Sequence, residues 1–243
     1  MIIEGKNPVR ELLTSDRNIE KIYIEKNNTN HELAELTSKA KSKKILVSFV
    51  DKYVLDKMSP SGKHQGILAN TSEFEYESLE NVVKNEKSKD KPLFLLILDG
   101  IEDPHNLGSI IRVGECCGIS GIIIPKHRAV GVTDTVAKIS QGAIEHTAVI
   151  KVTNINDAIR ELKAMGVFVY CADMDGELIY KANLAGDIAI VIGGENTGVK
   201  ALTKKLADGI ISLPQFGKIN SLNASVATGA ILYEAIRQRN YVK

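Results

Sequence analysis

The sequence predicts an α/β protein in two parts, with a mostly parallel sheet in the second part. Residues 93–98, "LFLLIL", form a continuous apolar run, as expected of a strand buried on both faces. Further apolar runs follow, and stretches with helical spacing separate them. This alternation is typical of a parallel sheet covered by helices. A charged, mostly polar segment precedes the first run and separates it from shorter elements nearer the start of the chain.

The first part is expected to be a small α/β domain over residues 1–72. Residues 31–43 have helical spacing, because Leu33, Leu36 and Ala40 fall on one face of a helix. Short strands are expected on either side of this helix and after the turn "SPSG", at residues 19–25, 44–49 and 64–70.

The second part is expected over residues 92–243, after a linker at 73–91. Ligands of parallel sheets bind just beyond the carboxyl ends of the strands. Three polar, glycine-containing segments follow apolar runs and occupy that position: "DGIEDPHNLG" (99–108), "GGENTG" (193–198) and "LPQFGKINSLN" (213–223). The sequence therefore predicts that these three segments build the functional site.

The bulk composition narrows the class of protein. The chain has 243 residues, 44% of them hydrophobic, and 31 basic and 30 acidic residues give a net charge of +1. A near-neutral chain can still bind nucleic acid through a local basic patch. The three cysteines form no C-x-x-C pair, so we expect a reducing cytoplasm. The histidines lack metal-ligand spacing, and neither a signal peptide nor an apolar run of ~18 residues is found, so we expect no metal and no membrane segment.

The glycine-rich segment does not match the common nucleotide-binding motifs. Gly193 and Gly198 have the spacing of a P-loop, but Val199 stands where the phosphate-binding lysine belongs. The G-x-G-x-x-G pattern of dinucleotide-binding enzymes does not follow any of the predicted strands either. A nucleotide-dependent enzyme of small molecules is therefore disfavoured. An ordinary strand-to-helix turn with Glu195 as a solvated charge remains an alternative for this segment.

The first polar segment leads into a helix that carries Asn106 and Arg112. Asn106 could cap the helix, and Arg112 could form a surface ion pair with Glu115, worth about 0.2–0.5 kcal/mol. Arg112 lies off the apolar stripe of this helix, which consists of Leu107, Ile110, Ile111 and Gly114. We therefore expect an exposed arginine.

The third polar segment precedes a long helix that begins with small residues. Ser221 or Asn223 could cap it. Gly229 in its interior costs about 0.8–1 kcal/mol relative to alanine, which close packing against a neighbour would justify. Arg237 and Arg239 at its end are explained by the helix dipole alone.

Together the three segments resemble the motifs of the SpoU/TrmH family of RNA ribose 2′-O-methyltransferases, in the SPOUT (α/β-knot) superfamily. Asn106 followed six residues later by Arg112 is similar to the first motif, and the glycine-flanked Glu195 to the second. "LPQFGKINSLNASVA" is similar to the third, although "PQF" departs from the methionine that often follows the proline. Near the start of the chain, "GKNPVREL" and "HQGI" resemble the family's ribosomal-protein-like RNA-binding domain.

The resemblance implies a trefoil-knotted SPOUT domain that binds S-adenosylmethionine and works as a homodimer through this C-terminal domain. It implies a working set of side chains that consists of Asn106, Arg112, Glu195, Ser221 and Asn223. It implies cofactor contacts, largely through backbone groups, at Gly193, Gly194, Ile211, Leu213 and Leu222. In the homodimer, the small residues of the last helix would face the partner.

Within the family, the resemblance points to the subgroup that methylates a guanosine of 23S ribosomal RNA. A tRNA 2′-O-methyltransferase and a non-catalytic RNA-binding ribosome-assembly factor are the alternatives. RNA contacts are expected from the first domain, at Lys6, Arg10, Lys63 and His64. The competing interpretation is that these side chains are solvated surface charges.

Overall fold

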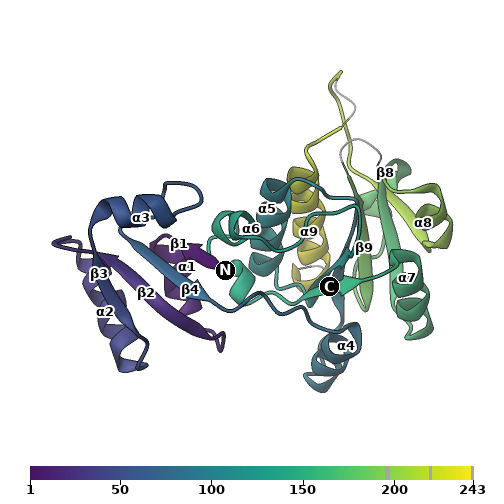
Figure 1. The fold of residues 1–243 in the computed structure, drawn as a ribbon. Coiled ribbons are helices and arrows are strands. Elements are labelled where there is room, and N and C mark those ends of the chain that lie inside the picture. Colours follow the sequence, from purple (N-terminus) through teal and green to yellow (C-terminus); the bar gives the residue numbers. More distant parts are fainter. Residues whose placement is uncertain (195–197, 219–220, 242–243) are drawn as a thin grey trace. The chain divides into compact units, whose positions relative to one another are not determined.

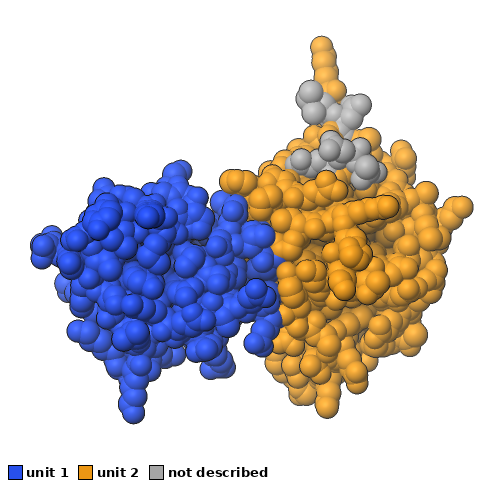
Figure 2. Space-filling model, in the orientation of Figure 1, with its two compact units in different colours: residues 1–75, 132–146 blue, residues 76–131, 147–243 orange. Residues whose placement is uncertain are grey.

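The computed structural model describes residues 1–194, 198–218 and 221–241, and its chain divides into two compact units (Figure 2). Unit 1 comprises residues 1–75 and 132–146, and unit 2 comprises residues 76–131 and 147–243. Each unit contains its own sheet.

Unit 1 is built on a four-stranded sheet with the order β1-β4-β2-β3. β4 pairs antiparallel with β1 and β2, whereas β2 and β3 are parallel. The helices and strands of this unit, shown in Figure 1, are β1 (Ile2–Glu4), α1 (Lys6–Leu12), β2 (Ile19–Glu25), α2 (His31–Ser42), β3 (Val47–Val50), α3 (Lys52–Met58), β4 (Ile67–Thr71), α6 (Asp134–Ile139) and a 3-10 turn (Ala143–Glu145).

The elements of the first part follow the sequence pattern closely. β2 has the predicted bounds, and α2 ends one residue before its predicted end. The side-chain oxygen of Asn30 accepts a hydrogen bond from the backbone N–H of Glu32 at 2.9 Å and so caps α2. Leu33, Leu36 and Ala40 are buried, as their common face predicts.

Residues 132–146 belong to unit 1, although they lie between two strands of unit 2 in the sequence. The Asp134 carboxylate accepts from the backbone N–H of Ile2 at 3.1 Å. The Lys138 ammonium donates to the carbonyl oxygen of Lys63 at 2.6 Å. The sequence-based division at 92–243 placed this segment in the second domain, because chain order carries no sign of these long-range bonds.

Unit 2 is built on a six-stranded sheet with the order β10-β8-β9-β5-β6-β7, and all of its paired strands are parallel. The mostly parallel sheet that the sequence predicts is therefore confirmed. Its elements are α4 (Leu79–Ser88), β5 (Phe94–Asp99), α5 (Pro104–Cys116), β6 (Gly121–Pro125), β7 (Val149–Val152), α7 (Ile155–Ala164), β8 (Phe168–Leu178), a 3-10 turn (Ile179–Lys181), β9 (Ile188–Gly193), α8 (Ala201–Leu206), β10 (Gly209–Ser212) and α9 (Ala224–Tyr241).

α4 occupies the segment that was expected to be a linker. Leu79, Val82 and Val83 are buried in the core of unit 2, and the Ser78 side chain caps the helix. The many charges of this segment lie on the opposite face of the helix, so charge density concealed a short amphipathic pattern.

The two faces of the unit 2 sheet are covered by different helices (Figure 1). Leu95 and Ile97 point to the face that α4 and α7 cover. The alternate residues of β5 point to the opposite face, where α5 and α9 pack against each other. A Cβ on Gly229 would lie 3.6 Å from Val113 of α5, so Gly229 packs within the chain. That the small residues of α9 face a second copy stays a prediction.

Within the described ranges, the helices are too short or too polar to cross a membrane. Likewise, His, Cys, Asp and Glu side chains do not gather into a group of three or more that could hold a metal ion in the part of the chain that the structure describes.

Unit 1 contains a buried ion pair whose loss we expect to be costly. Arg17 donates to Glu145 at 3.0 Å, and the two side chains are only 10% and 4% exposed. Glu145→Gln leaves the guanidinium buried without its counter-charge, so we expect the free energy of unfolding to fall by about 3 kcal/mol. Urea denaturation followed by circular dichroism measures this change. Asp157→Asn, in an exposed pair with Arg160, is the control and is expected to cost less than about 0.5 kcal/mol; equal losses in the two variants would contradict the prediction.

Candidate active site

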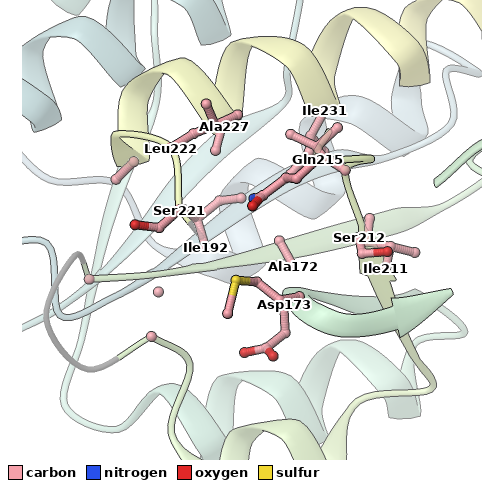
Figure 3. A pocket seen from close by; sticks show the side chains of 16 residues that line it. Ala172, Asp173, Ile192, Ile211, Ser212, Gln215, Ser221, Leu222, Ala227 and Ile231 are labelled. Atoms are coloured by element: carbon pink, nitrogen blue, oxygen red, sulfur yellow. The ribbon is translucent and has the colours of Figure 1, made fainter. Parts of the chain in front are cut away.

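A cavity of about 290 Å³ lies where the middle of β8 and the carboxyl ends of β9 and β10 meet the start of α9 (Figure 3). It is of the size and character of a small-molecule pocket, because most of its walls are apolar side chains and backbone. The lining residues are Ala172, Asp173, Met174, Ile192, Gly193, Gly194, Gly198, Ile211, Ser212, Leu213, Gln215, Ser221, Leu222, Ala224, Ala227 and Ile231.

This cavity contains all five residues at which the sequence predicts cofactor contacts. They are Gly193, Gly194, Ile211, Leu213 and Leu222. Ser221 of the predicted catalytic set also lines it, whereas Glu195 lies outside the described residues. The structure thus brings the second and third polar segments to one pocket.

Two glycines allow the pocket wall to form. A Cβ on Gly193 would lie 2.2 Å from the carbonyl carbon of Gly198, and a Cβ on Gly194 would lie 2.3 Å from the carbonyl oxygen of Gly100. Real side chains do not approach backbone so closely, so only glycine permits this contact between segments. These contacts let the backbone of Gly193 and Gly194 form part of the cavity lining.

A buried aspartate fixes both ends of the glycine-rich segment. Asp99, only 2% exposed, ends β5, and its carbonyl oxygen accepts from the N–H of Gly194 at 3.0 Å. Its carboxylate lies 2.5 Å from the Lys200 ammonium and 3.3 Å from the Lys200 backbone nitrogen. The Thr203 hydroxyl lies 3.2 Å from the same carboxylate. These bonds attach the first and second polar segments to each other.

Asn106 and Asn223 attach the first segment to the third. The Asn223 amide donates to the Asn106 side-chain oxygen at 2.9 Å. Asn223 also caps α9, because its side-chain oxygen accepts from the N–H groups of Ser225 at 3.0 Å and Val226 at 3.3 Å. Asn106 is buried and does not cap α5; Asp103 does so by accepting from the N–H of His105 at 2.9 Å. Asn106 is therefore available for the contact between segments.

Arg112 lies on the exposed face of α5, two turns after Asn106, as the apolar stripe predicts. The alternative Arg112–Glu115 ion pair does not form, and Arg112 has no hydrogen bond or ion pair with any residue that the structure describes. Six residues correspond to about 9 Å along a helix axis.

The two buried cysteines of unit 2, Cys117 and Cys171, are unsuited to nucleophilic catalysis. Burial raises the pKa of the Cys171 thiol to about 12, with nearby Asp99 as a second cause. Burial likewise raises the pKa of Cys117 to about 11, with neighbouring Cys116 as a second cause. A thiol with so high a pKa supplies almost no thiolate at neutral pH.

The sequence analysis missed the contribution of β8 to the pocket. Ala172, Asp173 and Met174 line the cavity, but apolar runs were the basis for predicting strands, and the run at residues 167–172 ends before Asp173. An available signal was the acidic run "DMDGE" directly after that apolar run, at the same edge of a parallel sheet as the other polar segments.

Most of the side chains predicted to contact RNA in unit 1 have partners within the unit. Lys6 and Arg10 both pair with Glu32, and their hydrogen bonds hold the pKa of that carboxyl below its usual value. His64 is buried: its Nδ1 accepts from the N–H of Gly66, so Nε2 carries the proton toward Asp56, 3.0 Å away. Of the four, only Lys63 is an exposed cation whose ammonium has no partner among the described residues. Because His64 is buried, both the predicted RNA contact and the solvated-charge alternative are wrong for it, and it is a structural residue.

Both parts of the chain match known family models. Residues 93–233 match the SpoU rRNA Methylase family, and residues 2–77 match the RNA 2′-O ribose methyltransferase substrate binding model. YacO of Bacillus subtilis, named as a TrmH family tRNA/rRNA methyltransferase, is 43% identical over 98% of this chain and 96% of its own length. A protein of the same family name from Staphylococcus saprophyticus is 41% identical over 100% and 97%.

Solved structures share the fold. The SpoU methyltransferase AviRb from Streptomyces viridochromogenes, in complex with AdoMet, superposes with a TM-score of 0.85 at 20% identity, over 100% of this chain and 91% of AviRb. An AdoMet-bound rRNA methyltransferase from Sinorhizobium meliloti gives a TM-score of 0.79 at 24% identity, over 97% and 86%. The predicted SPOUT fold is thereby confirmed.

The close backbone contact at Gly194 generates a stability prediction. Gly194→Ala places a methyl group against the Gly100 carbonyl, so we expect the free energy of unfolding to fall by about 1–3 kcal/mol. Gly217→Ala is the matched control, because no atom lies within 4 Å of the added Cβ, and we expect a change within about 0.5 kcal/mol. Denaturant titration of both variants measures the difference, and an unchanged Gly194→Ala protein would refute the tight contact.

The family models, the relatives and the shared fold agree with the motifs that the structure assembles around the cavity. The family's cofactor is S-adenosylmethionine, and the cavity has the backbone-rich, largely apolar walls that such a ligand requires. The chain belongs to the SpoU/TrmH family of SPOUT RNA methyltransferases.

Proposed function

We propose that the protein methylates the ribose 2′-hydroxyl of a guanosine in 23S ribosomal RNA. The observation that carries this proposal is the position of Asn223 between Leu222 and Ala224, which line the cavity, together with its hydrogen bond to Asn106. Asn106 lies on α5, the helix that also carries Arg112. Neighbouring elements thus offer a ligand pocket, hydrogen-bonding amides and a cation that pairs with none of the described residues. Reaction at a weakly acidic hydroxyl needs such groups.

S-adenosylmethionine would supply a methyl group bound to a sulfonium. After transfer of this methyl group, the sulfur would leave as a neutral thioether. The residues that would hold it are those that line the cavity, with backbone groups of Gly193 and Gly194 on one side and Leu213 and Leu222 on the other. The protein's own task is to position the hydroxyl and to stabilise the charge that develops on it.

Arg112 is suited to that charge. A guanidinium stays protonated, with a pKa above ~12, so it serves poorly as a general base. We assign it instead to the developing oxyanion and to a neighbouring RNA phosphate, with water or phosphate accepting the proton. Asn106 and Asn223 support the nucleotide through amide hydrogen bonds that their mutual contact orients.

The RNA class is proposed from two features. The substrate-binding model matched by residues 2–77 supports a ribose as the modified group, and the SpoU rRNA Methylase model supports ribosomal RNA. The names of the relatives include tRNA, so a tRNA substrate is the second candidate.

Three free cysteines support a reducing cytoplasm as the location.

The test measures transfer of tritiated methyl groups from S-adenosylmethionine to unmodified 23S, 16S and transfer RNA. We expect incorporation into 23S RNA at a guanosine 2′-oxygen, located by primer extension at low nucleotide concentration. Arg112→Ala should lower the rate by about 10²–10³-fold, as loss of an oxyanion-stabilising group does, while cofactor affinity stays within twofold. Arg160→Ala, on exposed α7, is the control and should keep full activity.

Several outcomes would contradict this proposal. Incorporation into tRNA alone would replace ribosomal RNA by the second candidate. RNA binding without methyl transfer would favour a non-catalytic assembly factor. Equal loss of activity and cofactor affinity in Arg112→Ala would make the arginine structural.

We also propose that the enzyme is a homodimer through the outer face of α9. Val226, Ala230 and Tyr233 fall on one stripe of this helix and are exposed. Leu222 extends the stripe at the pocket edge. Because α9 lies beside α5, a second copy on this face would approach Arg112.

A charge in this stripe should disrupt the dimer. Tyr233 is 58% exposed, and Tyr233→Glu is expected to shift the protein to a monomer in light scattering after gel filtration, because a carboxylate would be buried in the interface. Tyr53→Glu in unit 1, at a tyrosine that is 69% exposed, is the matched control and should remain dimeric. A wild-type protein that elutes as a monomer would refute the dimer.

A further inference from the structure

Asp173, at the carboxyl end of the apolar part of β8, is a pocket residue that the motifs leave without a role. Its side chain is 16% exposed, and it lies across the cavity from Ser221 and Leu222 (Figure 3). The other lining residues that the structure describes are apolar or carry uncharged polar groups. Among them, Asp173 therefore provides the charged side chain.

The carboxylate of Asp173 is held in place from outside the cavity. The Lys204 ammonium of α8 lies 2.5 Å from Oδ2, and the backbone N–H of Asp175 lies 3.4 Å from Oδ1. Gly198 of the pocket wall is adjacent, since a Cβ there would lie 3.9 Å from Oδ2. Lys204 does not line the cavity, so a bound ligand would meet the carboxylate and not the ammonium.

The chemistry of the proposed reaction changes the charge of what occupies this cavity. When the methyl group passes to the ribose oxygen, the S–CH₃ bond breaks, its electron pair stays on sulfur, an O–CH₃ bond forms, and the hydroxyl proton leaves to water or phosphate. The sulfonium thereby becomes a neutral thioether, while the ammonium and carboxylate of the methionine moiety are unchanged. A fixed anion in the wall therefore attracts the donor, which carries the sulfonium charge, more strongly than the product, which has lost it. This difference is larger in the cavity than in water, because low-dielectric walls weaken Coulomb attraction less than water does.

We infer that Asp173 makes the pocket prefer S-adenosylmethionine over S-adenosylhomocysteine by charge, and that Lys204 moderates this preference. The inference rests on the proposed function, which places the cofactor in this cavity. It assigns Asp173 to specificity: the residue favours entry of the donor and release of the product. The competing explanation is that the pair only ties β8 to α8.

Calorimetric titration of the full chain with three ligands separates these explanations. S-adenosylmethionine, S-adenosylhomocysteine and sinefungin differ where the sulfur stands: the first carries a sulfonium, the second a thioether and the third an amine. For Asp173→Asn we expect affinity for both cationic ligands to fall about tenfold, which is ~1.4 kcal/mol, and affinity for S-adenosylhomocysteine to change less than twofold. Lys204→Met breaks the same ion pair but keeps the carboxylate, so the preference for cationic ligands should persist or rise.

Equal loss of affinity for all three ligands in Asp173→Asn would overturn the inference, because a structural role does not distinguish their charges. An unchanged set of affinities would overturn it as well. If Asp173→Asn does not fold, Lys204→Met decides: a reduced preference for the cationic ligands would show that the intact pair, and not the anion, matters. A wild-type protein that binds none of the three would refute the cofactor pocket itself, and a wild-type protein that binds them with equal affinity would refute only the charge preference.

Discussion

The pocket depends on the buried carboxylate of Asp99. Removing a carboxylate from water costs several kcal/mol unless charged and hydrogen-bonding partners replace the solvent. Lys200 and Thr203 supply those partners, and the backbone oxygen of the same residue holds Gly194. Gly194 and Lys200 flank the glycine-rich segment, so the backbone oxygen of Asp99 fixes one end of that segment against β5 and its buried carboxylate fixes the other. The wall of the cavity follows from this arrangement.

The parts of the fold that the sequence predicted are those that depend on local pattern. Continuous apolar runs in residues 93–98 and 188–193 can be satisfied only by strands covered on both faces, and parallel pairing places their ends at one edge. The sequence alone therefore predicted that the three polar segments, which are far apart in the chain, lie close together in the fold. β8 was only half predicted, because it continues through polar residues to Leu178. Backbone pairing with β10 extends the strand beyond its apolar part. Because the prediction relied on apolar content, Asp173 was overlooked.

The features that the sequence could not supply depend on long-range partners. Glu32 binds both Lys6 and Arg10, so two expected RNA contacts are partly neutralised by a carboxylate more than twenty residues away. Residues 132–146 join unit 1 through bonds to Ile2 and Lys63, which no periodicity announces. Charge in a sequence shows that a side chain needs water or a partner. It does not show which of the two the fold provides.

The unpaired state of Arg112 follows from the same reasoning. A guanidinium that is to stabilise a developing alkoxide must not already be neutralised by a carboxylate, since the pair would have to break in every turnover. Glu115 is one turn away on the same helix, yet the two side chains do not pair. Asn106, a neutral amide, occupies the position nearest the third segment instead. Among the described residues, therefore, acidic side chains do not pair with Arg112. The acidic side chain of Asp173 instead lines the cavity, where a positively charged ligand would lie.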